Sequence, residues 1–140
     1  TLSRGDVPTR FGVGVAYLGI RGGTIGMRAS HEGWSSLSKL GSAGFTAHDA
    51  WDLGAGADVP GPRFGRNVLQ LRAGVRRRGL PFAAAGERVT ESSVSFGTGT
   101  AFANGRVFGD LGVTRASRSV PSGNADERAW TVSLGLAVRP

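Results

Sequence analysis

The sequence predicts an all-β chain of about seven or eight antiparallel strands in up-and-down order. Segments in which large apolar side chains alternate with small or polar ones recur along all 140 residues. No stretch of ten or more residues has the periodicity of a helix. Glycine makes up 24 of the 140 residues and lies mostly on one face of the alternating segments. A single β domain covering residues 1–140 follows from this length and pattern.

The last segment, Trp130–Pro140, has the longest unbroken alternation. One face holds Trp130, Val132, Leu134, Leu136 and Val138, and the other holds Thr131, Ser133, Gly135, Ala137 and Arg139. A strand that crosses a membrane needs about 9–11 residues, with apolar side chains toward lipid and polar ones toward a wet lumen. A soluble β-sandwich would show the same alternation, with the large side chains packed on a second sheet. Both interpretations are open at this point.

The N-terminal half predicts three strands. They are Arg10–Leu18, Thr24–Ser30 and Ala47–Val59. A tight turn at 21–23 joins the first two, and a long loop at Glu32–Gly44 precedes the third. The segment Pro60-Gly61-Pro62 is expected to end the third strand, because proline has no N–H to donate to a neighbouring strand.

The C-terminal half predicts four more strands. They are Asn67–Arg76, Ser93–Phe102, Arg106–Thr114 and Trp130–Pro140. Long loops are expected at Gly79–Arg88 and Ser119–Arg128. Asn104-Gly105 predicts a hairpin with a type I′ turn, because both central positions of that turn need a positive φ.

Short and long connections alternate in this scheme, so all the short ones would lie at one end of the sheet. This asymmetry is typical of outer-membrane barrels, which have short periplasmic turns and longer extracellular loops.

Charged residues also recur in the polar register, where a wet lumen could hold them and a dry core could not. They are Arg10, Arg28, Asp52, Asp58, Arg72, Arg76, Glu91, Arg106, Asp110 and Arg139. We therefore expect a transmembrane β-barrel or part of one; the alternative is that these residues form the solvent side of a soluble sheet.

Four segments resemble the C-terminal half of FadL-like outer-membrane barrels. They are Ala50–Gly56, Val59–Phe64, Leu71–Phe82 and Leu134–Pro140. Members of that family take up long-chain fatty acids and other hydrophobic molecules through a longer barrel with an N-terminal hatch. The resemblance implies a C-terminal fragment of such a barrel in a bacterial outer membrane, in contact with lipid, lipopolysaccharide and hydrophobic small molecules, and working without a cofactor.

Apolar residues in the loops and on the polar face are the candidates for contact with a hydrophobic substrate. They are Trp34, Leu37, Leu40, Leu80, Pro81, Phe82 and Phe108. The alternative is that these residues only pack the loops together. Two rival functions remain open: a small structural or adhesive barrel closed by Arg–Asp pairs, and a soluble β-sandwich binding module.

Motifs for other chemistry are missing from the sequence. The chain has no cysteine, and the spacing of His31 and His48 matches no metal-ligand motif. No catalytic or phosphate-binding motif occurs, so we expect neither an enzyme nor a cofactor. The net charge of +7 comes almost wholly from arginines, which are scattered except for the run Arg76–Arg78. That run could contact lipopolysaccharide phosphates; the scatter of the others argues against nucleic acid.

Overall fold

The computed structural model describes residues 8–20, 22–35, 47–84, 87–123 and 126–138. These residues form one antiparallel sheet of seven strands in sequence order, which confirms the predicted all-β, up-and-down fold. The strands are β1 (Thr9–Ile20), β2 (Gly23–Gly33), β3 (Ala50–Phe64), β4 (Asn67–Ala84), β5 (Glu87–Phe102), β6 (Val107–Ser119) and β7 (Asp126–Val138). Within the described part of the chain, no helix is long and apolar enough to cross a membrane.

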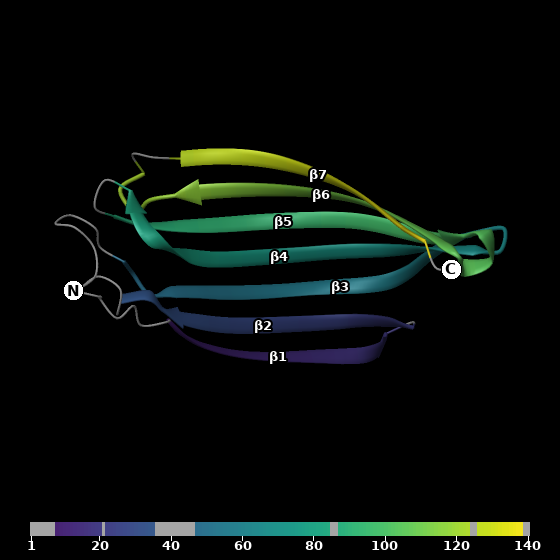
Figure 1. Ribbon diagram of the computed structural model, residues 1–140, viewed down its shortest axis with the longest axis horizontal. Coiled ribbons are helices and arrows are strands. Elements are labelled where there is room, and N and C mark those ends of the chain that lie inside the picture. Colours follow the sequence, from purple (N-terminus) through teal and green to yellow (C-terminus); the bar gives the residue numbers. More distant parts are fainter. Residues whose placement is uncertain (1–7, 21, 36–46, 85–86, 124–125, 139–140) are drawn as a thin grey trace, which may run out of the picture.

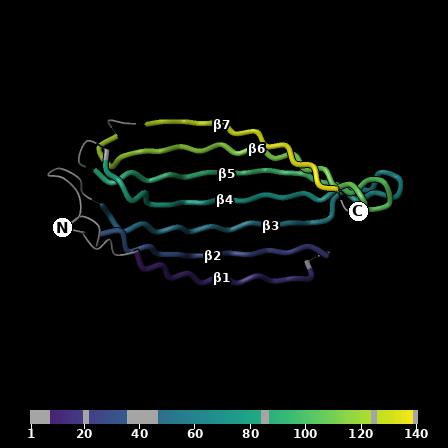
Figure 2. The backbone as a smooth tube through the Cα atoms, viewed as in Figure 1, coloured from purple at the N-terminus to yellow at the C-terminus, as the bar shows by residue number. Residues whose placement is uncertain are grey.

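The sheet is open, with β1 and β7 as its two edges (Figure 1). Because each of the six steps from β1 to β7 reverses direction, the two edge strands run the same way. The backbone trace shows that the sheet twists, so that strands lying side by side at one end overlap in projection at the other (Figure 2). This twist is the normal consequence of strand stereochemistry.

The pairing register keeps the two predicted faces separate across the whole sheet. One row joins Val15, Met27, Ala55, Val75, Val94, Arg115 and Trp130 from β1 to β7. The adjacent row joins Ala16, Gly26, Gly56, Gly74, Ser95, Thr114 and Thr131. Since neighbouring residues of a strand point to opposite faces, a slip of one residue would have mixed these rows.

The expected end of the third strand at Pro60-Gly61-Pro62 is wrong. Strand β3 continues to Phe64, and the pairing with β4 shifts between Pro60 and Arg63. A bulge tolerates proline because the extra residues do not have to donate to the neighbouring strand. The turn itself is Gly65-Arg66, where Gly65 has a φ of +62° that favours glycine.

The expected long loop at Gly79–Arg88 is also wrong. Strand β4 runs to Ala84 and β5 begins at Glu87, with a register shift between Gly79 and Ala83. The bulge interrupts the alternation, which is why the segment resembles a loop in the sequence. The connection between β6 and β7 is also shorter than expected, because β6 reaches Ser119 and β7 begins at Asp126. Strand β2 reaches Gly33, and β3 begins at Ala50, three residues later than expected.

The expected turn at Asn104-Gly105 is confirmed. Asn104 and Gly105 have φ values of +57° and +85°, and the Arg106 N–H donates to the carbonyl of Ala103 at 3.2 Å. Both central residues are therefore left-handed, as a type I′ turn requires. Arg106 belongs to this turn, and β6 begins one residue later.

The described residues bury very little apolar surface. One small cluster joins Leu80, Val89 and Val120, each about 6 % exposed. It lies where the ends of β4 and β5 project beyond the sheet, next to the segment that follows β6. We call this the loop end of the sheet. We call the opposite end, with Gly22 and the turns at 65–66 and 103–106, the turn end. The rest of the sheet is a single layer.

Candidate functional site

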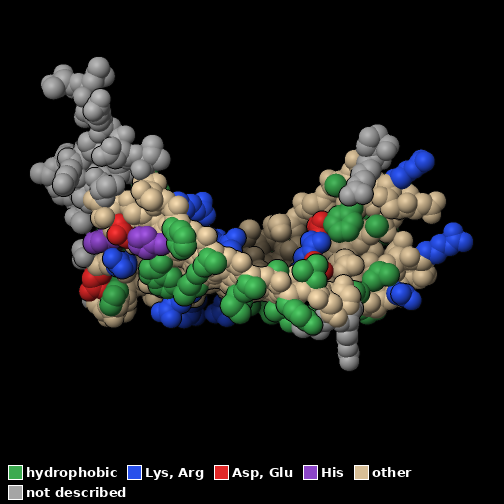
Figure 3. Space-filling view, turned by 90° about the horizontal axis from the view of Figure 1, so that it is seen from below, with side chains coloured by type: hydrophobic (Ala, Val, Ile, Leu, Met, Phe, Trp, Pro, Cys, Tyr) green, Lys and Arg blue, Asp and Glu red, His purple; other side chains and the backbone are tan. Residues whose placement is uncertain are grey.

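Large hydrophobic side chains cover one face of the sheet from edge to edge; we call it the apolar face. It includes Phe11, Val13, Val15, Met27, Leu53, Val75, Phe96, Leu111, Trp130, Val132, Leu134, Leu136 and Val138, all exposed. Leu134 is 85 % exposed and Leu136 is 75 % exposed. In the space-filling view, hydrophobic side chains follow one side of the molecule from end to end (Figure 3). In a β-sandwich these leucines would be buried against a second sheet. The described strands, however, form only one sheet.

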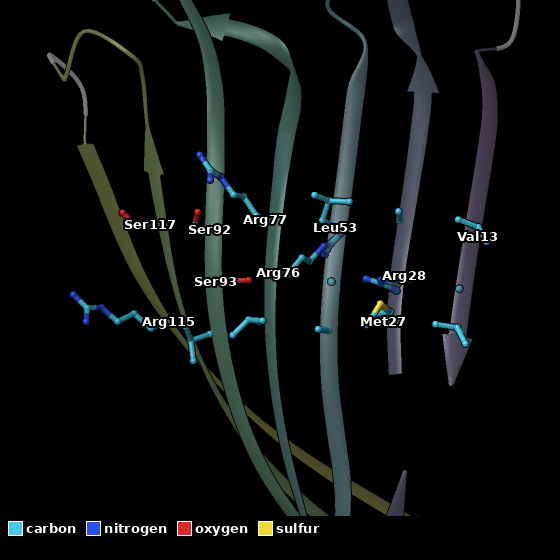
Figure 4. Close-up of a pocket in the computed structure, with 17 residues that line it drawn as sticks. Val13, Met27, Arg28, Leu53, Arg76, Arg77, Ser92, Ser93, Arg115 and Ser117 are labelled. Atoms are coloured by element: carbon cyan, nitrogen blue, oxygen red, sulfur yellow. The ribbon is translucent and has the colours of Figure 1, made fainter. Parts of the chain in front are cut away.

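A hollow of about 780 Å³ lies on the apolar face and extends from β1 to β6. Its floor is formed mainly by aliphatic side chains, among them Val13, Met27, Leu53, Val75 and Val94. Arg77, Ser92, Arg115 and Ser117 line its polar side (Figure 4). Four arginines line the hollow as well; Arg77 and Arg115 belong to the apolar face, and Arg28 and Arg76 to the opposite face.

The opposite face, which we call the polar face, is held by ion pairs between strands. Near the loop end, the Glu91 carboxylate on β5 accepts hydrogen bonds from Arg78 on β4 at 2.8 Å and from Arg118 on β6 at 2.7 Å. Glu91 is almost fully buried, with 8 % of its side chain exposed. Arg118 also reaches Glu127 on β7 at 3.3 Å. This chain of charges connects four neighbouring strands.

A second group of charges, on β2, β3 and β4, lies beside the ion pairs of Glu91. Arg76 donates to Asp52 through its Nε atom at 2.8 Å, and Arg28 lies 3.9 Å from the same carboxylate. Asp52 is directly opposite Arg78 in the pairing of β3 and β4. One carboxylate thus lies among three guanidinium groups.

A third group lies toward the turn end. Arg72 on β4 donates to Asp58 on β3 and to Asp110 on β6, at 2.7 Å each. The Arg72 side chain crosses over β5 to reach Asp110. At the crossing point the residues of β5 are glycines, which have no side chains in its way. A Cβ atom at Gly99 would lie only 2.5 Å from the Asp110 carboxylate, so the absence of a side chain there leaves room for this ion pair.

Small side chains separate the charged groups at the two ends of the polar face. They form the row of Ala16, Gly26, Gly56, Gly74, Ser95, Thr114 and Thr131. This row lines much of a second hollow, of about 650 Å³, on the polar face. The polar face can therefore hold water between two zones of paired charges.

The structure does not gather the predicted substrate-binding residues into one site. Leu80 lies in strand β4 and is buried in the cluster at the loop end, whereas Phe82, in the same strand, is 47 % exposed. Both were expected in a loop. Trp34 is half-buried and donates its indole N–H to Glu32 at 2.8 Å. Leu37 and Leu40 lie outside the described residues.

Phe108 lies on the polar face at the turn end, paired with Ala101 and Ala137. Its ring centroid is 6.0 Å from the Arg72 guanidinium, a distance at which a cation and an aromatic ring attract each other. Leu80 is at the other end of the sheet, so the two cannot contact one substrate molecule of ordinary size together. Packing against Arg72 is the role that the geometry gives to Phe108.

The arginine run Arg76–Arg78 is divided between the two faces. Arg76 and Arg78 pair with carboxylates on the polar face, and Arg77 points to the apolar face, where it lines the hollow. The run is therefore not a cationic cluster. Its separation follows from the two-residue period of a strand, a signal that the sequence already contains.

The two histidines lie near the connection between β2 and β3. The Nε2 atom of His31 lies 4.0 Å from Asp49, and the backbone N–H of His48 donates to the carbonyl of Pro81 at 3.0 Å. The backbone N–H of Ser35 donates to Asp49 at 2.9 Å and holds the pKa of Asp49 below its usual value. Among the described residues, no group of three or more His, Asp or Glu could hold a metal ion.

Comparison with protein-family models, with curated proteins and with solved structures finds no significant match to this chain.

Proposed function

We propose that this chain forms part of the wall of a β-barrel in a bacterial outer membrane. The single observation behind the proposal is that one sheet has an exposed apolar face over all seven strands and an ion-paired face opposite it. Lipid covers such an apolar face without a second protein layer, and a wet lumen accommodates paired charges. This arrangement also explains why so few hydrophobic residues are buried.

The height of the apolar face fits a membrane. On β7 the outward row extends from Trp130 to Val138, which is about 27 Å at about 3.4 Å per residue. The apolar band of outer-membrane barrels is about 25 Å tall. Trp130 lies at the loop end of this row and Tyr17 at the turn end of the row on β1, where aromatic residues favour the membrane interface.

The open edges set a condition for closing such a barrel. Since β1 and β7 run in the same direction, pairing them directly would give a parallel pair. Antiparallel closure requires an odd number of further strands between them. The FadL-like resemblance implies further strands, because the barrels of that family are longer than the seven strands described here.

Reconstitution of the 140-residue chain tests the membrane location. We expect it to float with phosphatidylcholine vesicles in a density gradient and to show mainly strand by circular dichroism. Brominated acyl chains should quench Trp130 fluorescence, because its side chain lies on the apolar face. A chain that stays monomeric in the aqueous fraction without detergent would contradict the proposal and favour a soluble protein.

For the complete barrel, we propose passive uptake of hydrophobic small molecules. Support comes from the resemblance and from Phe82, an exposed aromatic residue at the loop end. The rival function, a structural or adhesive barrel without transport, is favoured by the charge network around Glu91 and Asp52, which would narrow the lumen. Binding of a hydrophobic ligand separates the two functions.

Phe82→Ser should weaken the binding of a fluorescent long-chain fatty acid to the reconstituted protein by about tenfold, the effect expected when one aromatic contact is lost. The matched control is Phe64→Ser, which removes an exposed phenylalanine at the turn end. Fluorescence titration measures both affinities. No binding at all would support the structural rival, and equal affinities in the wild type and both variants would show that Phe82 is not part of the binding site.

A further inference from the structure

Two arginines on the apolar face lack a carboxylate partner among the described residues. Neither Arg77 nor Arg115 forms an ion pair with a described residue, and the Arg115 guanidinium lies 5.6 Å from the centroid of the Trp130 ring. Both side chains are exposed. This contrasts with the polar face, where Arg72, Arg76, Arg78 and Arg118 are all paired. The presence of two unpaired guanidinium groups next to a large apolar surface therefore requires an explanation.

The register places the two arginines close together. Arg77 is level with Ser92 and Ser117, and Arg115 is level with Val75 and Val94, one outward position further from the loop end. Two strand spacings and two residues along the strand separate their Cα atoms by about 12 Å. Two long, flexible side chains can approach a single group across that distance. In Figure 4 the side chain of Arg77 leans from β4 over β5, above the hollow.

The hydroxyl groups beside them add hydrogen-bonding capacity. Ser92 is exposed on β5 between the two arginines. Ser117 donates to Asp126 at 3.1 Å, and that carboxylate is also paired with Arg128 at 3.3 Å. The negative charge of Asp126 is thus offset by Arg128, and the charges of Arg77 and Arg115 remain uncompensated.

We propose that Arg77, Arg115 and Ser92 bind the phosphate headgroup of an anionic bilayer lipid, whose acyl chains lie against the apolar floor of the hollow that these residues line. The inference rests on the proposed membrane location of the apolar face. Arginine suits this ligand because its planar guanidinium makes paired hydrogen bonds to phosphate oxygens. The aliphatic floor formed by Val75, Val94, Leu53 and Met27 suits acyl chains. The position beside Trp130, at the end of the apolar row, corresponds to the depth of lipid headgroups.

The test measures lipid selectivity with the 140-residue chain in phosphatidylcholine vesicles. Brominated phosphatidic acid and brominated phosphatidylcholine are compared as quenchers of tryptophan fluorescence. We expect the wild type to prefer phosphatidic acid by about fivefold for each arginine that contacts the phosphate. The double variant Arg77→Gln/Arg115→Gln should lose most of this preference and keep the strand content measured by circular dichroism.

The matched control is Arg63→Gln/Arg66→Gln, which removes two exposed arginines at the turn end. It should retain the preference of the wild type. Quenching by both lipids without any preference would overturn the lipid site and leave the membrane location intact, as would an equal loss in the control. Absence of quenching by either lipid would overturn the membrane location and the site with it.

Discussion

Leu134→Arg should prevent stable insertion of the chain into vesicles. Leu134 is the middle residue of the outward row on β7, opposite Leu111, and 85 % of it is exposed. Arginine at the midplane of the lipid-facing surface of a barrel costs about 2–4 kcal/mol, which corresponds to a loss of roughly 30-fold to 1000-fold in the insertion equilibrium. Flotation with phosphatidylcholine vesicles across a urea series measures this change.

The matched control is Thr131→Arg on the same strand. Thr131 faces the opposite side, in the row of small residues on the polar face, so the new charge would meet water in a wet lumen. We expect this variant to insert nearly as well as the wild type. If the two variants inserted equally, or if Thr131→Arg were the worse, the assignment of the two faces to lipid and lumen would be wrong.

Glu91→Gln should destabilise the folded sheet by about 2 kcal/mol, the scale of lost hydrogen bonds to charged groups. The carboxylate of Glu91 holds both Arg78 and Arg118, and its loss brings two guanidinium groups together without a countercharge. The effect is smaller than the 3–5 kcal/mol typical of a fully buried pair, because a third or more of each arginine side chain is exposed. Urea unfolding followed by circular dichroism measures the free energy of unfolding.

Glu127→Gln provides the control for that experiment. Glu127 contacts the same Arg118 but is 68 % exposed, and an exposed ion pair contributes only about 0–1 kcal/mol. The variant should therefore unfold at almost the same urea concentration as the wild type. An equal loss of stability in both variants would mean that the burial of Glu91 has no energetic consequence.

The sequence by itself determined the fold class, the approximate positions of the seven strands and the two faces of the sheet. The reason is local: successive side chains of a strand point to opposite sides, so alternation such as that of Trp130–Val138 defines the faces before any pairing is known. The same rule separates Arg77 from Arg76 and Arg78. The type I′ turn was predictable for a similar reason, since Asn104 and Gly105 tolerate positive φ better than other residues.

Only the tertiary structure decided where strands continue through irregular sequence and which charges meet. The bulges after Pro60 and Gly79 depend on the neighbouring strand, whose pairing compensates for missing donors and extra residues. Arg72 and Asp110 are 38 residues apart and on strands that are not adjacent, so their ion pair depends on register, on twist and on the space above Gly99. The candidate substrate residues were separated for the same reason: an apolar side chain in the sequence does not specify its neighbours, and β4 places Leu80 in a buried cluster while Phe82 remains exposed.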